Sequence, residues 1–165
     1  MAKTSATGAQ GTNLYGLVQL VANSSHFQAV CGAGSAEAAE ARVHWPCFEA
    51  DEVGEIDRPA AVVLINEFAW EKVAGGGQNY LLPRGSLNLL FTDYDRHPGD
   101  YQASIVEFLN FVDGTLADIA AKSAEDSRIS IVRIEQTVKP MISSPTDSQR
   151  PHWLAQYEVA WDPVG

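Results

Sequence analysis

Hydrophobic spacing divides the chain into a helical first quarter and a later series of strands around one long helix. Two strand-like runs come first, at roughly residues 60–71 and 85–94. A helical pattern follows at roughly residues 100–122, and two more strand-like runs span roughly 128–138 and 153–161. A long polar segment joins each pair of strands. The first pair fits an antiparallel hairpin.

The long helix carries the strongest periodic signal in the chain. Its apolar residues recur at steps of three and four, which is typical of one helical face packed on a core. This stripe consists of Tyr101, Ile105, Phe108, Leu109, Val112, Leu116 and Ile119. Val106 and Phe111 fall off the stripe, so they either widen the core face or contact a neighbouring subunit. Gly114 weakens the helix by about 1 kcal/mol relative to Ala.

The strand-like runs differ in pattern. The last run alternates most clearly, because one face carries only apolar residues, namely Trp153, Ala155, Tyr157, Val159 and Trp161. The first run is continuously apolar over residues 62–65, which suits a strand covered on both faces. Residues 71–84, EKVAGGGQNYLLPR, interrupt the first pair and predict a flexible glycine loop at the hairpin tip.

The first quarter predicts short helices. Asn13 is placed to cap the first, Ser24 or Ser25 the second, and Ser35 the third. Residues 1–12 are small and polar and predict a flexible arm, so residues 13–165 form the single expected domain. The predicted fold is therefore α+β. It has a mixed, largely antiparallel sheet of about four strands, with the long helix and the short N-terminal helices packed on it.

Charge limits the range of partners. The net charge of -10 disfavours sequence-specific nucleic-acid binding and an anionic membrane surface, both of which attract clustered Lys and Arg. No apolar run reaches about 18 residues, so no membrane-spanning helix is expected. The N-terminus lacks the apolar segment of a secretory signal, which favours a cytoplasmic setting. Acidic residues gather in a predicted loop, where they are solvated, repel nucleic acid or dock on a basic neighbour: Glu49, Asp51, Glu52, Glu55 and Asp57.

The chain offers no convincing catalytic, cofactor-binding or metal-binding set, so we expect no enzyme. Cys31 and Cys47 are expected to be free thiols, although the sequence leaves a pairing open. His97 lies near Asp93, Asp95 and Asp100, which is the nearest approach to an acid–base or metal group. Asp-rich turns more often supply turn and capping hydrogen bonds.

The chain resembles the tail terminator proteins of long-tailed, siphovirus-like bacteriophages. The resemblance begins in residues 14–46, LYGLVQLVANSSHFQAVCGAGSAEAAEARVHWP. Here the family's first helix, short segment with a Phe, and Ala-rich helix correspond to residues 14–22, Phe27 and residues 36–42. It continues through RPAAVVL, the glycine-bearing hairpin, YQASIVEFLNFVDGTLADI and the final aromatic strand ending in WDP, and so covers nearly the whole chain in element order.

The resemblance implies a structural virion protein without a cofactor. Such subunits form a homo-oligomeric ring, commonly a hexamer, at the head-proximal end of the tail. The ring caps the tail tube protein, ends tail polymerisation, meets the head–tail connector protein and lets the genome pass through it. The alternatives are another head–tail junction or tail-completion protein, or a small cytoplasmic ligand-binding or enzymatic domain using the surroundings of His97.

The family has no motif that transfers contact residues, so interface candidates come from physical chemistry alone. Ring contacts need exposed apolar anchors and adaptable loops. The glycine hairpin and the polar segment before the last strand offer both. The candidates are Gly75, Gly76, Gly77, Tyr80, Leu82, Arg84, Arg150 and His152. Ring size, the face that meets the tube and the timing of ring formation stay open.

Overall fold

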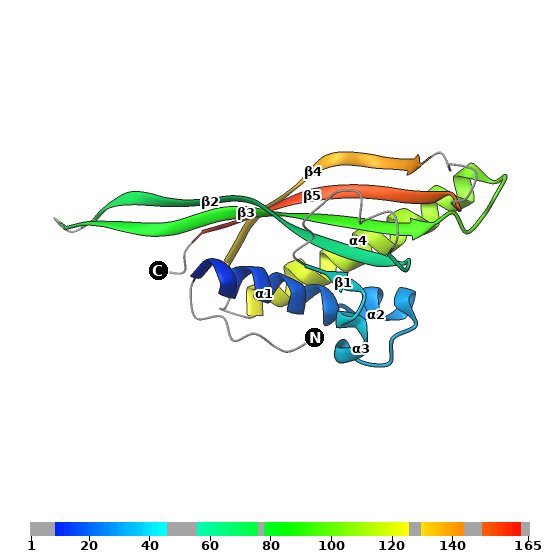
Figure 1. Ribbon diagram of the computed structural model, residues 1–165, viewed down its shortest axis with the longest axis horizontal. Helices are drawn as coiled ribbons and strands as arrows, with labels where there is room; N and C mark the ends of the chain where they lie inside the picture. Colours follow the sequence, from blue (N-terminus) through cyan, green and yellow to red (C-terminus); the bar gives the residue numbers. More distant parts are fainter. Residues whose placement is uncertain (1–8, 46–55, 76–77, 126–129, 144–149, 163–165) are drawn as a thin grey trace.

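The fold is α+β, with helices packed on one face of a five-stranded mixed sheet (Figure 1). The computed structural model describes residues 9–45, 56–75, 78–125, 130–143 and 150–162. The helices are α1 (Ala9–Ala22), α2 (Ser25–Cys31), α3 (Ala36–Glu40) and α4 (Tyr101–Glu125). The strands are β1 (Val43–His44), β2 (Ala60–Gly75), β3 (Gln78–Tyr94), β4 (Ser130–Ser143) and β5 (His152–Asp162).

The sheet order is β1-β2-β3-β5-β4. β1 runs parallel to β2, and every other neighbouring pair is antiparallel. The predicted α+β class, the long helix and the largely antiparallel sheet are therefore confirmed. The sheet has five strands instead of the predicted four or so. The strand that the prediction missed is β1, which is only two residues long. So short a strand shows no alternation in the sequence.

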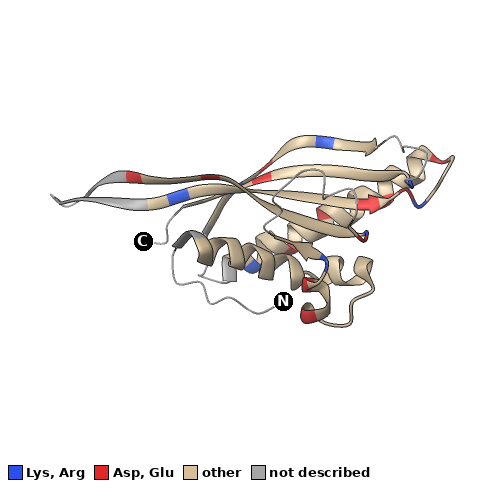
Figure 2. Cartoon of the chain, viewed as in Figure 1, with Lys and Arg blue, Asp and Glu red and all other residues tan. Residues whose placement is uncertain are grey.

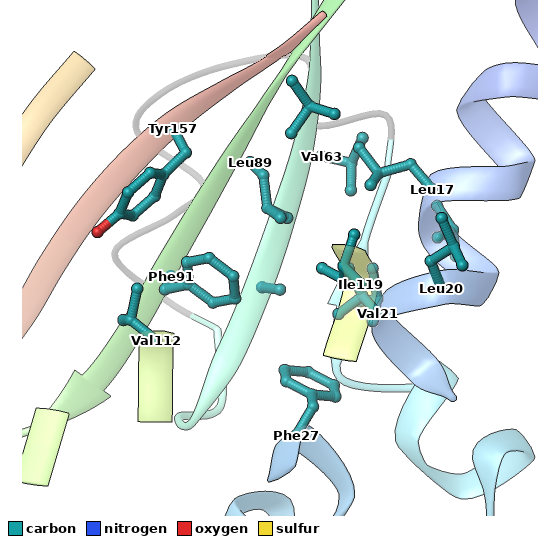
Figure 3. Packing of buried hydrophobic residues seen from close by; sticks show 14 of the residues in the cluster. Leu17, Leu20, Val21, Phe27, Val63, Leu89, Phe91, Val112, Ile119 and Tyr157 are labelled. Atoms are coloured by element: carbon teal, nitrogen blue, oxygen red, sulfur yellow. The ribbon is translucent and has the colours of Figure 1, made fainter. Parts of the chain in front are cut away.

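The core lies between the sheet and the helices. Figure 3 shows side chains of α1, α2 and α4 meeting those of β2, β3 and β5. The predicted apolar face of β5 is confirmed, because every residue on it is buried. The two residues off the α4 stripe differ in burial. Phe111 is 4% exposed and packs in the core, whereas Val106 is 55% exposed.

The starts of the short helices show which capping predictions hold. Ser24 caps α2 by accepting a hydrogen bond from the Phe27 backbone N–H at 3.2 Å, and Ser35 caps α3 in the same way. The prediction for Asn13 is wrong. The first helix already begins at Ala9, inside the stretch expected to be a flexible arm, so Asn13 lies within α1. Residues 1–8 lie outside the described residues.

The predicted acidic loop and one of the two cysteines lie largely outside the described residues. The acidic residues from Glu49 to Glu55, together with Cys47, lie outside the described residues. Cys31 has a free thiol, whose pKa burial raises to about 11. Across the described ranges, we find no helix with the length and apolar character needed to cross a membrane.

Candidate assembly interface

A two-stranded ribbon projects from one end of the sheet (Figure 1). β5 pairs with β3 only from Gly85 to Tyr94, whereas the ladder between β2 and β3 continues to Gly75 and Gln78. Among the described residues, 69–75 and 78–84 therefore pair only with each other, and we call this ribbon the arm. At about 3.3 Å per residue, each of its strands is about 23 Å long.

The arm corrects the predicted flexible loop at residues 71–84. These residues continue the antiparallel ladder, and Gly75 pairs with Gln78 directly at the tip. The described helices leave the outer part of the ribbon uncovered (Figure 1), and apolar residues do not alternate along this stretch, so the sequence pattern could not reveal the strands. Tyr80 and Leu82 occupy strand positions opposite Val73 and Glu71. Gly76 and Gly77 lie outside the described residues, as do the Tyr80 and Leu82 side chains.

The arm leaves the sheet at a β-bulge whose partner strand requires a glycine. The register between β2 and β3 shifts between Ile65 and Glu67, and Gly85 lies opposite Phe68. A Cβ atom on Gly85 would lie 2.3 Å from the Glu67 carbonyl oxygen and 3.0 Å from Phe68 Cδ1. Bulges bend and twist a strand pair, so this close packing sets the direction of the arm.

The arm carries an exposed aromatic side chain next to the aromatic core. Phe68 packs on the buried Trp161, with ring centroids 6.3 Å apart. Two residues further along β2, Trp70 is 57% exposed. Phe68 and Trp70 alternate in the sequence with the period of a strand, but this pattern does not identify Trp70 as a surface residue.

Acidic and basic residues are equal in number along the arm and its base. Residues 67–84 contain Glu67, Glu71, Lys72 and Arg84, so this stretch is neutral in a chain with a net charge of -10. The candidate Arg84 forms an exposed ion pair with Glu71 at 2.6 Å. Figure 2 shows acidic and basic residues interspersed over the described ribbon, without a broad basic face.

The second group of candidates lies at the opposite end of the same ladder. Tyr94 pairs with His152 there, nine positions along β3 from the pairing of Gly85 with Trp161. Arg150 lies with its guanidinium carbon 4.4 Å from the centroid of the Tyr94 ring. His152 is only 7% exposed, and burial lowers its pKa. The structure therefore separates the two candidate groups, and of the second group Arg150 is the exposed residue.

Exposed apolar residues accompany Arg150 at this end, and the sequence analysis missed them as surface residues. Tyr101 was assigned to the core stripe, but it is 62% exposed while its ring contacts Trp153 at a centroid distance of 5.5 Å. Met141 and Ile142 are 53% and 37% exposed. They belong to β4, which extends beyond its predicted end, past Pro140. Proline is tolerated there because β4 is an edge strand.

The group around His97 forms turn and capping contacts. Asp95 Oδ1 accepts hydrogen bonds from Ser104 Oγ at 2.6 Å and from the His97 backbone N–H at 3.0 Å. Asp100 accepts one from the Ala103 backbone N–H at 3.1 Å at the start of α4, and the His97 ring contacts Glu107. Among the described residues, no group of three or more potential ligands is arranged to hold a metal ion.

Neither a protein-family model nor a curated protein sequence matches the chain in comparisons with known proteins. Two surfaces of the described structure bear on function. These are the arm at one end of the sheet and the exposed apolar residues with Arg150 at the other.

Proposed function

We propose that this chain is a structural subunit that self-associates through its arm and works as a tail terminator of a long-tailed bacteriophage. In this role a ring of about six subunits caps the tail tube, ends its polymerisation and presents a face to the head connector. The number of subunits and the tube come from the sequence resemblance. The self-association is argued from the arm.

The observation that carries the proposal is a ribbon of two strands that no third strand joins in the described part of the chain. An isolated two-stranded hairpin is at best marginally stable in water. Its outer edges leave backbone N–H and C=O groups unpaired, which favours pairing with another chain. The exposed Trp70 adds the kind of side chain that dominates binding energy at protein interfaces. Packing on a partner would satisfy all of these groups.

Because each subunit has one arm, the type of contact between neighbouring subunits can be inferred. The arm contacts a different surface on the next subunit, because an arm-to-arm contact would join only two copies. Contacts between different surfaces are heterologous, and they close into rings when the rotation between subunits permits. A ring matches the symmetry needed to cap a tube.

To test the proposal, the molecular mass of the purified protein is measured in solution with and without tail tubes, and both samples are imaged by electron microscopy. We expect rings, or a cap confined to one end of the tube. Trp70→Ser should weaken both ring formation and capping of the tube, whereas Val106→Ser should leave both unchanged. Val106 is a matched control because it is 55% exposed but lies on α4. A chain that stays monomeric and ignores tubes would contradict the proposal.

A further inference from the structure

We infer that the end of the sheet opposite the arm receives the arm of a second copy of this chain. The receiving surface, which we call the end patch, consists of Tyr101, Met141, Ile142 and Arg150. The inference rests on the proposed function and names the second contact surface that a head-to-tail ring requires.

Two apolar residues of the end patch lie next to one buried side chain. Ile142 pairs with Trp153 in the ladder between β4 and β5, and Met141 pairs with the neighbouring Leu154. The Tyr101 ring contacts Trp153 from α4. Tyr101 and Ile142 thus lie around Trp153, which is 1% exposed and fixed by a hydrogen bond from its Nε1 to Ser104 Oγ at 2.8 Å, whereas Met141 projects from the opposite face of the sheet. Interface anchors bind best on such a rigid, well-packed base.

Charge complementarity argues that the occupant is a second copy. The Arg150 guanidinium stacks on Tyr94 and forms no ion pair within the described ranges. At the base of the arm, the exposed Glu67 carboxylate likewise forms no ion pair with a described residue. Contacts between two chains of net charge -10 are generally opposed by repulsion. A contact between residues 67–84, which are neutral overall, and the end patch avoids that repulsion and gives each of these charges a partner.

The geometry prevents a subunit from filling its own end patch. The arm is anchored where Gly85 pairs with Trp161, and the end patch adjoins the pairing of Tyr94 with His152. Nine residue steps of extended strand separate these positions, or about 30 Å. The arm points away from the patch (Figure 1). Each subunit therefore offers one arm and one vacant patch, which is the arrangement that propagates head to tail.

The first test places the photo-cross-linker benzoylphenylalanine at position 70 of the full-length chain and maps its cross-links between copies by mass spectrometry. We expect cross-links to peptides that contain Tyr101, Met141 or Ile142. Cross-links confined to other surfaces, or no cross-links between copies, would overturn the inference. Capping of tubes is scored separately. Cross-linking at the patch without any capping therefore supports this inference and counts against the tail terminator function.

A second test uses paired variants. Tyr101→Glu should weaken self-association by about tenfold or more, as loss of an interface aromatic does. Its fold should persist, because an acidic residue suits the first turn of a helix. Val106→Glu is the matched control on the same helix. Mixing Trp70→Glu with Tyr101→Glu should give dimers and nothing larger, because only one intact arm and one intact patch can meet. A Tyr101→Glu chain that assembles like the parent would overturn the inference.

Discussion

At the scale of single residues, Asp118 connects two helices through one carboxylate oxygen. Its Oδ2 accepts hydrogen bonds from Ser24 Oγ at 2.7 Å and from the His26 backbone N–H at 3.2 Å, and it lies 2.9 Å from His26 Nδ1. Burial by itself raises the pKa of this carboxyl, but the hydrogen bonds from His26 and Ser24 outweigh it and hold the pKa well below its ordinary value. The start of α2 is thereby fixed to α4.

Replacing this carboxylate should destabilise the fold. Asp118→Asn should lower the free energy of unfolding by about 1–3 kcal/mol, the range for hydrogen bonds to a charged group. Urea denaturation measures the change. Asp113→Asn is the matched control, because Asp113 lies exposed on the same helix and forms no ion pair with a described residue. Equal losses in the two variants would contradict the role of Asp118.

The same carboxylate should give a defined dependence of stability on pH. Its folded-state pKa lies below the unfolded value of about 3.9, so it stabilises the fold above that pH. The contribution is lost as the pH falls toward the folded-state pKa. The difference in unfolding free energy between the parent chain and Asp118→Asn should therefore be constant near neutrality and shrink below about pH 4. A difference that grows on acidification would show the opposite sign and refute this account.

Gly114 illustrates what the sequence can and cannot predict at one position. The sequence shows a glycine that weakens a helix, but it does not show why a glycine is present. A Cβ atom at this position would lie 2.3 Å from His26 Cδ2, because α2 packs closely against α4 there. The reason for the glycine is a contact between residues far apart in the chain, so no local pattern contains it.

At the scale of elements, the base of the arm depends on Gly85. Gly85→Ala should lower the free energy of unfolding by about 1–3 kcal/mol, because the new methyl group meets the Glu67 carbonyl oxygen of the paired strand. Thermal and urea unfolding both report this loss. Gly34→Ala is the control, since a Cβ there meets no atom within 4 Å and should cost nothing. A Gly85→Ala chain as stable as the parent would mean that the bulge relaxes freely.

The arm should also open more readily than the rest of the sheet. Hydrogen-bonded amides in residues 70–74 should exchange with solvent about tenfold faster or more than those in residues 87–91, which lie in a strand paired on both sides. Hydrogen exchange followed by mass spectrometry or NMR resolves the two regions. Assembly should slow exchange in the arm selectively. Equal protection of both regions in the free subunit would remove the argument that the arm needs a partner.

At the scale of the whole molecule, the arm should be dispensable for folding and necessary for assembly. Replacing residues 70–83 with an Asn-Gly turn joins Ala69 to its partner Arg84 and leaves the rest of the sheet paired. The free energy of unfolding should change by no more than about 1 kcal/mol, because the arm pairs only with itself. Rings and tube caps should disappear in electron micrographs. Normal assembly of this shortened chain would exclude the arm as the interface.

The sequence by itself determined the elements whose side chains face a core. The stripe of α4 and the alternation of β5 are visible because burial on one side imposes a period of 3.6 or 2 on the residues. The same signal placed four of the five strands and the α+β class. Along the arm, which extends beyond the described helices (Figure 1), the sequence has no such pattern and predicts a loop in place of the two strands.

Only the tertiary structure decided the order of the strands, the projection of the arm and the composition of the end patch. The last strand inserts between β3 and β4 through backbone hydrogen bonds, which carry no side-chain signature. Tyr101 and Ile142 become neighbours of one Trp because the start of α4 and the end of β4 both lie near the start of β5. Periodicity reports whether a side chain is buried. It does not report which distant segment buries that side chain. The pairing of distant segments creates the arm and the end patch.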